Sequence, residues 1–251
     1  MTDLSVVFIS DVHVDPDGPD RAPLDRFIAF LDSLPGRARA LFILGDLFDL
    51  WTGHADADRP DNRRVIDALD RLERAGLSVT FVAGNRDLYF HDYLKKHRLL
   101  RSYPDLCLLE LDGKRLLVTH GDLLCLRDRC HLLLRRILSL KPFRLLFLAL
   151  PHSLAGRLAR SLRRHSQRAV RSKNPDTLAV DDDALRGIFS RSVDVVVCGH
   201  THRAEHRVLT VDGRACELFV LDAWTSRPGF LEYRNGSFTL GSPTVAGPLG
   251  T

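Results

Sequence analysis

The sequence predicts an α/β fold, because strand-like and helix-like segments alternate along the first part of the chain. Short runs of β-branched or apolar residues predict buried strands, and two stretches between the early runs, 23–34 and 61–75, have helical periodicity. In the second stretch, apolar side chains recur on one helix face: Val65, Ile66, Leu69 and Leu72. The predicted strands are 4–10, 39–44, 77–83, 115–120 and 193–198.

Later in the chain the pattern changes to pairs of strands. An Asp-Gly dipeptide lies between two apolar runs at 112–113 and again at 212–213. This dipeptide favours a tight hairpin turn, because both residues tolerate positive φ. We therefore expect two β-hairpins.

Length and composition are those of a globular protein. The 251 residues can bury a large core, and 45% apolar and 27% charged residues are ordinary values. No apolar run approaches the roughly 20 residues that span a bilayer, and the first ten residues lack the basic start of a signal peptide. The five cysteines show no CxxC spacing, which indicates neither a disulfide framework nor a zinc site. We expect a cytoplasmic protein.

One segment has a one-sided charge. Residues 129–173 contain twelve lysines or arginines and no aspartate or glutamate, although the net charge of the chain is only +4. Solvated helix surfaces usually mix both signs, so the segment predicts an anionic partner. Its leucines recur at helical spacing, and Pro142 and Pro151 divide it into about three helices.

The middle of this segment, PFRLLFLALP at 142–151, is apolar nearly all round. It is either a helix buried against the rest of the protein or a hydrophobic wall for a lipid or membrane surface, which the flanking cations favour. We expect residues 127–173 to form a helical cap, inserted into a core made of residues 1–126 and 174–251.

Each predicted core strand ends in side chains that can bind a metal. A single Gly-Asp turn or a single histidine has an ordinary structural explanation, but five such strand ends in one chain do not. Because ligands of an open α/β sheet bind at the carboxyl ends of its strands, we expect these groups to converge. In chain order they are Asp11 and His13, then Asp46, Asn85, His120, and finally His200 and His202.

The donor set suits divalent cations. Carboxylate and amide oxygens with four imidazoles, and no cysteine, are typical of Mn, Fe or Zn sites other than structural zinc. Seven groups are too many for one ion, whereas two ions that share a carboxylate would use all of them. Such a pair activates a hydroxide and binds the attacking and leaving oxygens of phosphoryl transfer. We expect two divalent metal ions, with Mn²⁺ as the first choice.

Eight motifs follow one another along the chain: DVHVD, LGDLFDLW, GNRD, HGDLLC, LFLALP, RRHSQRAVRSK, GHTHR and LDAW. This series resembles the calcineurin-like metallophosphoesterase superfamily, and within it the UDP-2,3-diacylglucosamine diphosphatases of lipid A synthesis, over nearly the whole chain. The resemblance implies a four-layer α/β/β/α sandwich with a helical cap insertion. It implies one metal held by Asp11, His13, Asp46 and His202, and another held by Asp46, Asn85, His120 and His200, with Asp46 as the bridge. We expect His200 and His202 to point to the same side of an extended turn.

The resemblance also implies a reaction. A metal-activated hydroxide attacks the α-phosphate of UDP-2,3-diacylglucosamine and gives UMP and 2,3-diacylglucosamine 1-phosphate, with Asn85, Arg86 and His120 as catalytic residues. In the cap, apolar helix faces would hold the acyl chains. The residues expected to bind substrate are Arg86, Asp128, Arg163, Ser166 and Lys173. The chain departs from the usual family pattern at Arg127, His131 and Gln167, which leaves the headgroup contacts there open.

The residue type at position 86 indicates which kind of leaving group the enzyme can release. Many metallophosphoesterases have a histidine directly after the Gly-Asn, where it protonates an alkoxide, whereas this chain has Arg86. Arginine does not donate a proton at neutral pH, but it binds phosphate oxygens and stabilises developing charge. Because a phosphomonoester leaves readily as an anion, Arg86 favours cleavage of a pyrophosphate bond. The alternative is a surface ion pair with Asp87.

Other functions stay open from the sequence. One is a metallophosphoesterase that acts on another nucleotide-sugar diphosphate or on a phosphodiester, including a nuclease, and another is a non-enzymatic scaffold. Nucleic-acid modules place aromatics among their cations, but 129–173 has only Phe143 and Phe147, so we expect no nucleic-acid partner. All seven ligands are present, which argues against a scaffold. The expected partners are an acylated UDP-sugar and the anionic surface of the inner membrane, bound peripherally from the cytoplasm.

Overall fold

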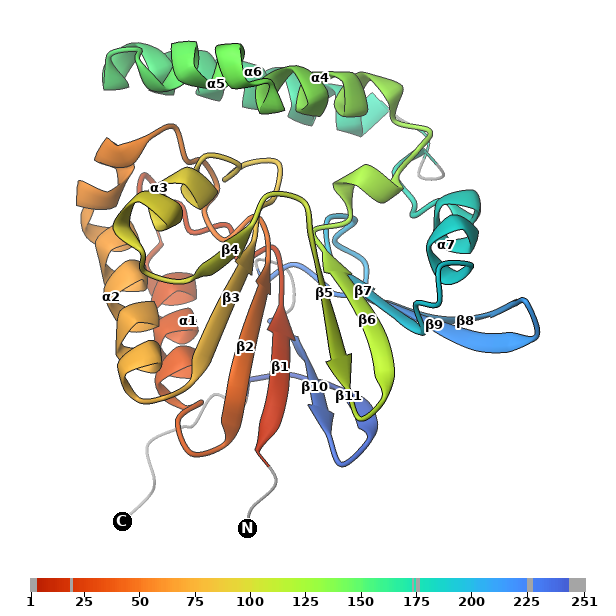
Figure 1. The fold of residues 1–251 in the computed structure, drawn as a ribbon. Helices are drawn as coiled ribbons and strands as arrows, with labels where there is room; N and C mark the ends of the chain where they lie inside the picture. The colour runs from red at the N-terminus through yellow and green to blue at the C-terminus, as the bar shows by residue number, and fades with distance from the viewer. Residues whose placement is uncertain (1–3, 19, 173, 175–176, 225–227, 244–251) are drawn as a thin grey trace.

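The centre of the protein consists of two β-sheets that pack face to face (Figure 1). The computed structural model that shows this describes residues 4–18, 20–172, 174, 177–224 and 228–243, and for residues 152 and 165–172 it describes the backbone.

The first sheet has six strands, in the spatial order β11 (Ser237–Gly241), β10 (Phe230–Arg234), β1 (Ser5–Ile9), β2 (Ala38–Leu44), β3 (Ser78–Val82) and β4 (Arg101–Tyr103). The second sheet has five, in the order β5 (Leu106–Leu111), β6 (Lys114–Thr119), β7 (Val195–Cys198), β9 (Arg214–Val220) and β8 (Glu205–Val211). The neighbours from β1 to β4 are parallel, as are β6 with β7 and β7 with β9. The remaining neighbours are antiparallel.

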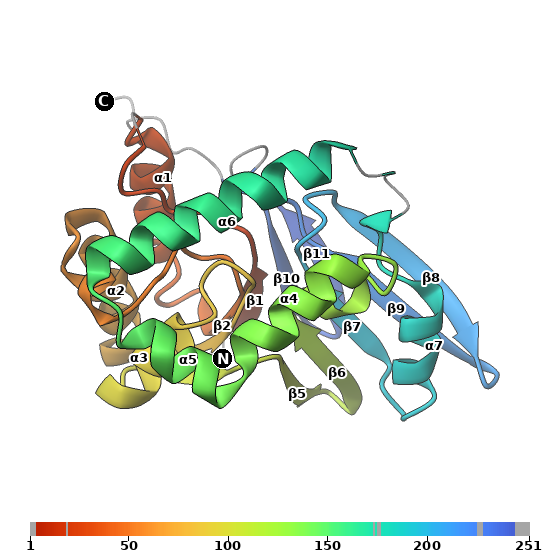
Figure 2. The ribbon, with the colours of Figure 1, turned by 90° about the horizontal axis from the view of Figure 1, so that it is seen from above.

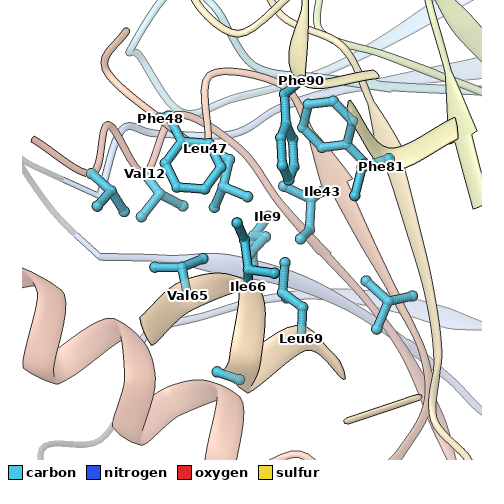
Figure 3. Close-up of a cluster of buried hydrophobic side chains, with 14 of the residues drawn as sticks. Ile9, Val12, Ile43, Leu47, Phe48, Val65, Ile66, Leu69, Phe81 and Phe90 are labelled. Atoms are coloured by element: carbon cyan, nitrogen blue, oxygen red, sulfur yellow. The ribbon is translucent and has the colours of Figure 1, made fainter. Parts of the chain in front are cut away.

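Helices cover the outer face of each sheet. They are α1 (Ala22–Asp32), α2 (Pro60–Arg74) and α3 (Phe90–His97) on the first sheet, and α7 (Asp182–Phe189) on the second. Figure 3 shows how Val65 and Leu69 of α2 face Ile9 and Ile43 of the first sheet. A separate apolar cluster, with Phe8 among its members, fills the space between the sheets. This is the predicted four-layer α/β/β/α sandwich.

Most local predictions are confirmed. The five predicted strands are β1, β2, β3, β6 and β7, and the two predicted helices are α1 and α2. The Asp-Gly turns join β5 to β6 and β8 to β9, and φ is positive at both residues of each turn. Helices α3 and α7 were not predicted, nor was the three-residue strand β4, which is too short to give a pattern. The β10–β11 hairpin was also missed, although its Asn235-Gly236 turn is a recognisable signal.

Three more helices form a layer beyond the carboxyl ends of the first sheet's parallel strands (Figures 1 and 2). They are α4 (Arg129–Ser139), α5 (Lys141–Leu148) and α6 (His152–Ser172). Pro142 lies in the first turn of α5 and Pro151 directly precedes α6, as expected from their missing N–H groups. In α5, Phe147 is buried while Leu145 and Leu146 are 68% and 65% exposed, so one face of the helix packs against the protein, as one interpretation of this stretch predicts, and the other face is open.

A buried ion pair fixes α4 to the core. The Nε of Arg135, a residue only 3% exposed, donates to Oδ2 of Asp122 at 3.1 Å. Burial opposes the ionisation of Asp122, but the hydrogen bond from His131 and the charge of Arg135 outweigh it and hold the pKa of that carboxyl below its usual value. Further along α4, the Tyr89 hydroxyl donates to the backbone carbonyl of Leu138 at 3.2 Å. The C-terminal half of α4 therefore attaches the helical layer to the core.

Candidate functional site

The seven predicted metal ligands lie together, at the ends of five strands. Asp11 and His13 follow β1, Asp46 follows β2, Asn85 follows β3, His120 follows β6, and His200 and His202 follow β7. Short distances join them into two groups, and the two sheets each contribute to both.

The first group consists of Asp11, His13 and His202. The Nε2 atom of His202 lies 3.1 Å from Oδ1 of Asp11 and 3.1 Å from Nε2 of His13. Two imidazole nitrogens that face each other at this distance need a proton or a cation between them. Three donor atoms of these residues lie within 4.8 Å of one another, which is the spacing of ligands around one ion.

The second group forms around His120. Its Nε2 atom lies 3.0 Å from Oδ1 of Asn85, 3.2 Å from Nδ1 of His200 and 3.6 Å from Oδ1 of Asp46. The ring is fully buried, and its Nδ1 is 2.9 Å from the backbone carbonyl of Leu44. That carbonyl accepts the Nδ1 proton, which leaves Nε2 free to act as a ligand.

Two carboxylates connect the groups. Asp46 lies between them, with Oδ2 4.0 Å from Nδ1 of His13 and Oδ1 3.6 Å from Nε2 of His120. Asp11 belongs to the first group and also forms a cluster within 4.8 Å with Asp46 and His120. The arrangement thus offers two adjacent cation sites with shared carboxylates, and both Asp11 and Asp46 are placed to be shared.

The backbone around these ligands is conformationally strained. Asp11, His13, Asp46, His200 and His202 all have positive φ, between +51° and +70°, and residues in this region cluster at functional sites. The prediction of an extended turn after β7 is therefore wrong. The left-handed backbone directs His200 toward His120 and His202 toward His13.

Glycine is required beside two of these carboxylates. A Cβ atom on Gly84 would collide with the Asp46 carboxylate, and one on Gly199 would collide with the side chains of Ser10 and Asp11. The glycines of the GN and GH motifs thus let neighbouring loops approach the ligands closely.

Protonation preferences fit metal binding. Burial lowers the pKa of His13 to about 4, and burial with the nearby charge of His120 lowers that of His200 to about 4, so both imidazoles are neutral at pH 7. Burial alone would lower the pKa of His120, but Asp46 and Asp11 raise it to about 9. The carboxylates thus favour a positive charge at this point, which a divalent cation supplies as well as a proton does.

Arg86 faces the site and does not pair with Asp87. Its Nη1 donates to Oδ1 of Asp49 at 2.6 Å, and its Nε lies 3.3 Å from Oδ2 of Asp46. Arg163 of α6 places Nη1 2.6 Å from the other oxygen of Asp49. One buried carboxylate therefore holds two arginines, one from the core and one from the helical layer.

Asp87 has a structural role instead. It is fully buried and accepts hydrogen bonds from the backbone N–H groups of Asp46, Leu47, Phe48 and Gly84. Burial and the adjacent Asp46 charge raise its pKa to about 7. Asp87 thus joins the loops after β2 and β3, which carry Asp46 and Asn85.

A cavity of about 140 Å³ opens beside Asn85 and Arg86, between the core and the helical layer. Three arginines, Arg86, Arg135 and Arg163, line it together with a mostly apolar wall. That wall is contributed by Leu50, Trp51, Leu88, Leu134, Leu138, Phe147, Ala159 and Leu162, and by Tyr89. The cavity can take an anionic group at one end and a hydrocarbon chain along the rest.

The other predicted substrate residues are placed differently. Asp128 is buried and caps α4, accepting from the N–H of His131 at 3.2 Å. The Ser166 side chain and all of Lys173 lie outside the described residues. Asp49 was not predicted as a site residue, and His131, which also lines the cavity, was predicted only as a departure from the family pattern. Asp49 lies within the LGDLFDLW motif, and its place in that motif is the sequence feature that could have identified it.

Comparison with known proteins agrees with this geometry. The family model of calcineurin-like phosphoesterases matches residues 4–204. A UDP-2,3-diacylglucosamine hydrolase of Aromatoleum aromaticum is 36% identical over 92% of this chain and 93% of its own length. Enzymes with the same name are 35% identical in Aeromonas salmonicida, covering 96% and 94%, and 36% identical in Pseudomonas entomophila, covering 94% and 97%. The chain therefore belongs to the calcineurin-like phosphoesterase family and, within it, to the family of these hydrolases.

Proposed function

We propose that this protein hydrolyses UDP-2,3-diacylglucosamine to UMP and 2,3-diacylglucosamine 1-phosphate. The observation that carries the proposal is the position of the cavity, which combines three arginines with an apolar wall and directly adjoins the ligand cluster. A substrate with a pyrophosphate between a nucleoside and an acylated sugar has the charge and the hydrocarbon that this arrangement accommodates. The names of the relatives support the same substrate.

The seven ligands fit two divalent cations, and we propose Mn²⁺. Asp11, His13, Asp46 and His202 would hold one ion, and Asp46, Asn85, His120 and His200 the other. Two such ions activate a water molecule and polarise the phosphoryl oxygens. The shared position of Asp46 between His13 and His120 supports its assignment as the bridge.

Arg86 and Arg163 act on the leaving phosphate. Both guanidinium groups line the cavity and are held by Asp49, so they are oriented before substrate binds. Bidentate contacts from arginine stabilise the charge that develops on the leaving phosphomonoester, which needs no proton donor. This supports cleavage of a pyrophosphate bond with attack on the α-phosphate, and Asn85, Arg86 and His120 as catalytic residues. Asp128, Ser166 and Lys173 complete the proposed set of substrate-binding residues.

Residues 127–173 serve as a cap over a core made of 1–126 and 174–251. The cap's leucines would receive the acyl chains from inside and meet the membrane from outside. In support, α4 to α6 leave large apolar side chains between 39% and 68% exposed, among twelve cations and no acids. These side chains are Leu133, Ile137, Leu140, Leu145, Leu146, Leu154 and Leu158.

The membrane contact that we propose is peripheral, at the cytoplasmic face of the inner membrane. Cations near an anionic surface each contribute about 1 kcal/mol of binding free energy. Among the described residues, no helix combines the length and the apolar character that crossing a bilayer requires.

A substrate panel tests the proposed function. With Mn²⁺ present, we expect UMP from the diacylated UDP-glucosamine, a much lower kcat/KM for its deacylated form, and negligible hydrolysis of alkyl phosphomonoesters. Exhaustive chelation should abolish turnover, and Mn²⁺ should restore it. Equal kcat/KM for the acylated and bare substrates would contradict the acyl-binding cap, and full turnover after chelation would contradict the metal mechanism.

A further inference from the structure

A second cavity borders the ligand cluster, on the side of His13. It measures about 150 Å³ and lies between the loop after β1 and the start of α1. Leu24 and Trp224 form apolar parts of its wall, and Asp15 lies on the same loop as His13. The first cavity adjoins the cluster at Asn85 instead, so the two cavities flank the ligands.

The two cavities differ in charge. The first is lined by three guanidinium groups and one carboxylate, whereas the second is lined by two guanidinium groups and three carboxylates. One of those guanidinium groups, that of Arg21, already forms an ion pair with Asp61. The second cavity therefore suits an uncharged polar group with hydrogen-bonding capacity better than it suits a phosphate.

An independent observation concerns Trp224, a residue in the wall of this cavity. Trp224 is 4% exposed, and its ring packs edge-on against Phe27 and Phe30. Among the described residues, nothing accepts the hydrogen of its indole Nε1, and a buried donor without an acceptor is unfavourable. Trp224 also borders a cavity between α1 and β10, but the described lining of that cavity includes none of the seven ligands.

The chemistry of the substrate requires two directions of exit from the reacting phosphorus. In a tetrahedral α-phosphate, the oxygen of the leaving sugar phosphate and the 5′ oxygen of the nucleoside diverge. If the acylated sugar phosphate lies in the arginine-lined cavity, the nucleoside extends to another side of the cluster. The cavity at His13 is on such a side and has the matching polarity.

We propose that the cavity lined by Asp15, Leu24 and Trp224 binds the uridine part of the substrate and of the product UMP. This inference rests on the proposed function and adds to it the place of the nucleoside. The Trp224 N–H donates to an acceptor of the nucleoside, Leu24 packs against it, and the Asp15 carboxylate at the cavity mouth accepts from a hydroxyl.

Calorimetric titration of the Mn²⁺-loaded full-length protein with UMP tests this assignment. Trp224→Phe keeps an aromatic ring against Phe27 and Phe30 but removes the N–H. We expect it to weaken UMP binding by about 5- to 10-fold, the effect of one neutral hydrogen bond, and to leave the binding of inorganic phosphate unchanged. The protein offers a matched control in Trp51, a buried tryptophan that lines the first cavity and whose Nε1 likewise has no acceptor among the described residues. Trp51→Phe should leave UMP affinity unchanged.

Asp15→Ala is a second variant, at an exposed position. It should weaken UMP but not phosphate. Unchanged UMP affinity in both variants, or an equal loss for UMP and phosphate, would overturn the assignment. A wild-type enzyme that releases no UMP from the diacylated substrate contradicts the proposed function itself, so the two failures are distinguishable.

Discussion

Replacing Asp49 with asparagine should uncouple the two arginines that face the reacting phosphate. Asp49 is 4% exposed and accepts from Arg86 on one oxygen and from Arg163 on the other, both at 2.6 Å. Asparagine keeps one acceptor and turns the other position into a donor. A hydrogen bond to a charged group contributes about 1.5–3 kcal/mol, and about 1.4 kcal/mol corresponds to a tenfold change. We therefore expect Asp49→Asn to lower kcat/KM by about 10- to 150-fold.

The assay is UMP release from the diacylated substrate, measured together with bound metal and thermal unfolding. Asp56→Asn is the matched control, because Asp56 is also a buried carboxylate of the same region, but it accepts from Thr52 and Gly53. It should cost stability and leave kcat/KM nearly unchanged. Equal kinetic losses in the two variants, or full activity in Asp49→Asn, would refute the positioning of the arginines by Asp49.

Three further predictions concern the metals, the ion pair of α4 and the cap. Asp46→Ala should reduce activity and bound metal more than His202→Ala, because Asp46 lies between both groups; metal analysis showing equal losses would contradict the bridge. Asp122→Asn leaves the buried Arg135 with only the half-exposed Asp105 as a counter-charge and should cost about 3 kcal/mol in urea unfolding, and a cost near zero would refute this. Leu146→Asp should weaken turnover of the diacylated substrate at unchanged metal content; unaltered turnover would argue against a role of that face.

The metal ligands could be predicted from the sequence because parallel strands bring their carboxyl ends to one edge. Each ligand is separated from a strand by at most a few residues, so strand periodicity alone located Asp11, Asp46 and His120 at that edge. The hairpins could also be predicted from the sequence, since an Asp-Gly dipeptide between two apolar runs is a local signal of a turn. The predictions of the ligands and of the hairpins both depend only on residues that are close together in the sequence.

Features that depend on contacts between distant segments were not predictable. The role of Asp49 arises only when α6 brings Arg163 next to Arg86, more than 70 residues away in sequence. The left-handed backbone at His200 and His202 accompanies side chains that reach two different histidines, His120 and His13, on other loops. Neither effect leaves a periodic signature in one strand or helix.

The central claim is that the reaction breaks the pyrophosphate bond by attack on the α-phosphorus. Hydrolysis of UDP-2,3-diacylglucosamine by the Mn²⁺-loaded enzyme in water enriched in ¹⁸O, followed by mass spectrometry of both products, tests it most directly. The account predicts one ¹⁸O atom in UMP and none in 2,3-diacylglucosamine 1-phosphate. Label in the sugar phosphate, or products other than these two, would contradict it.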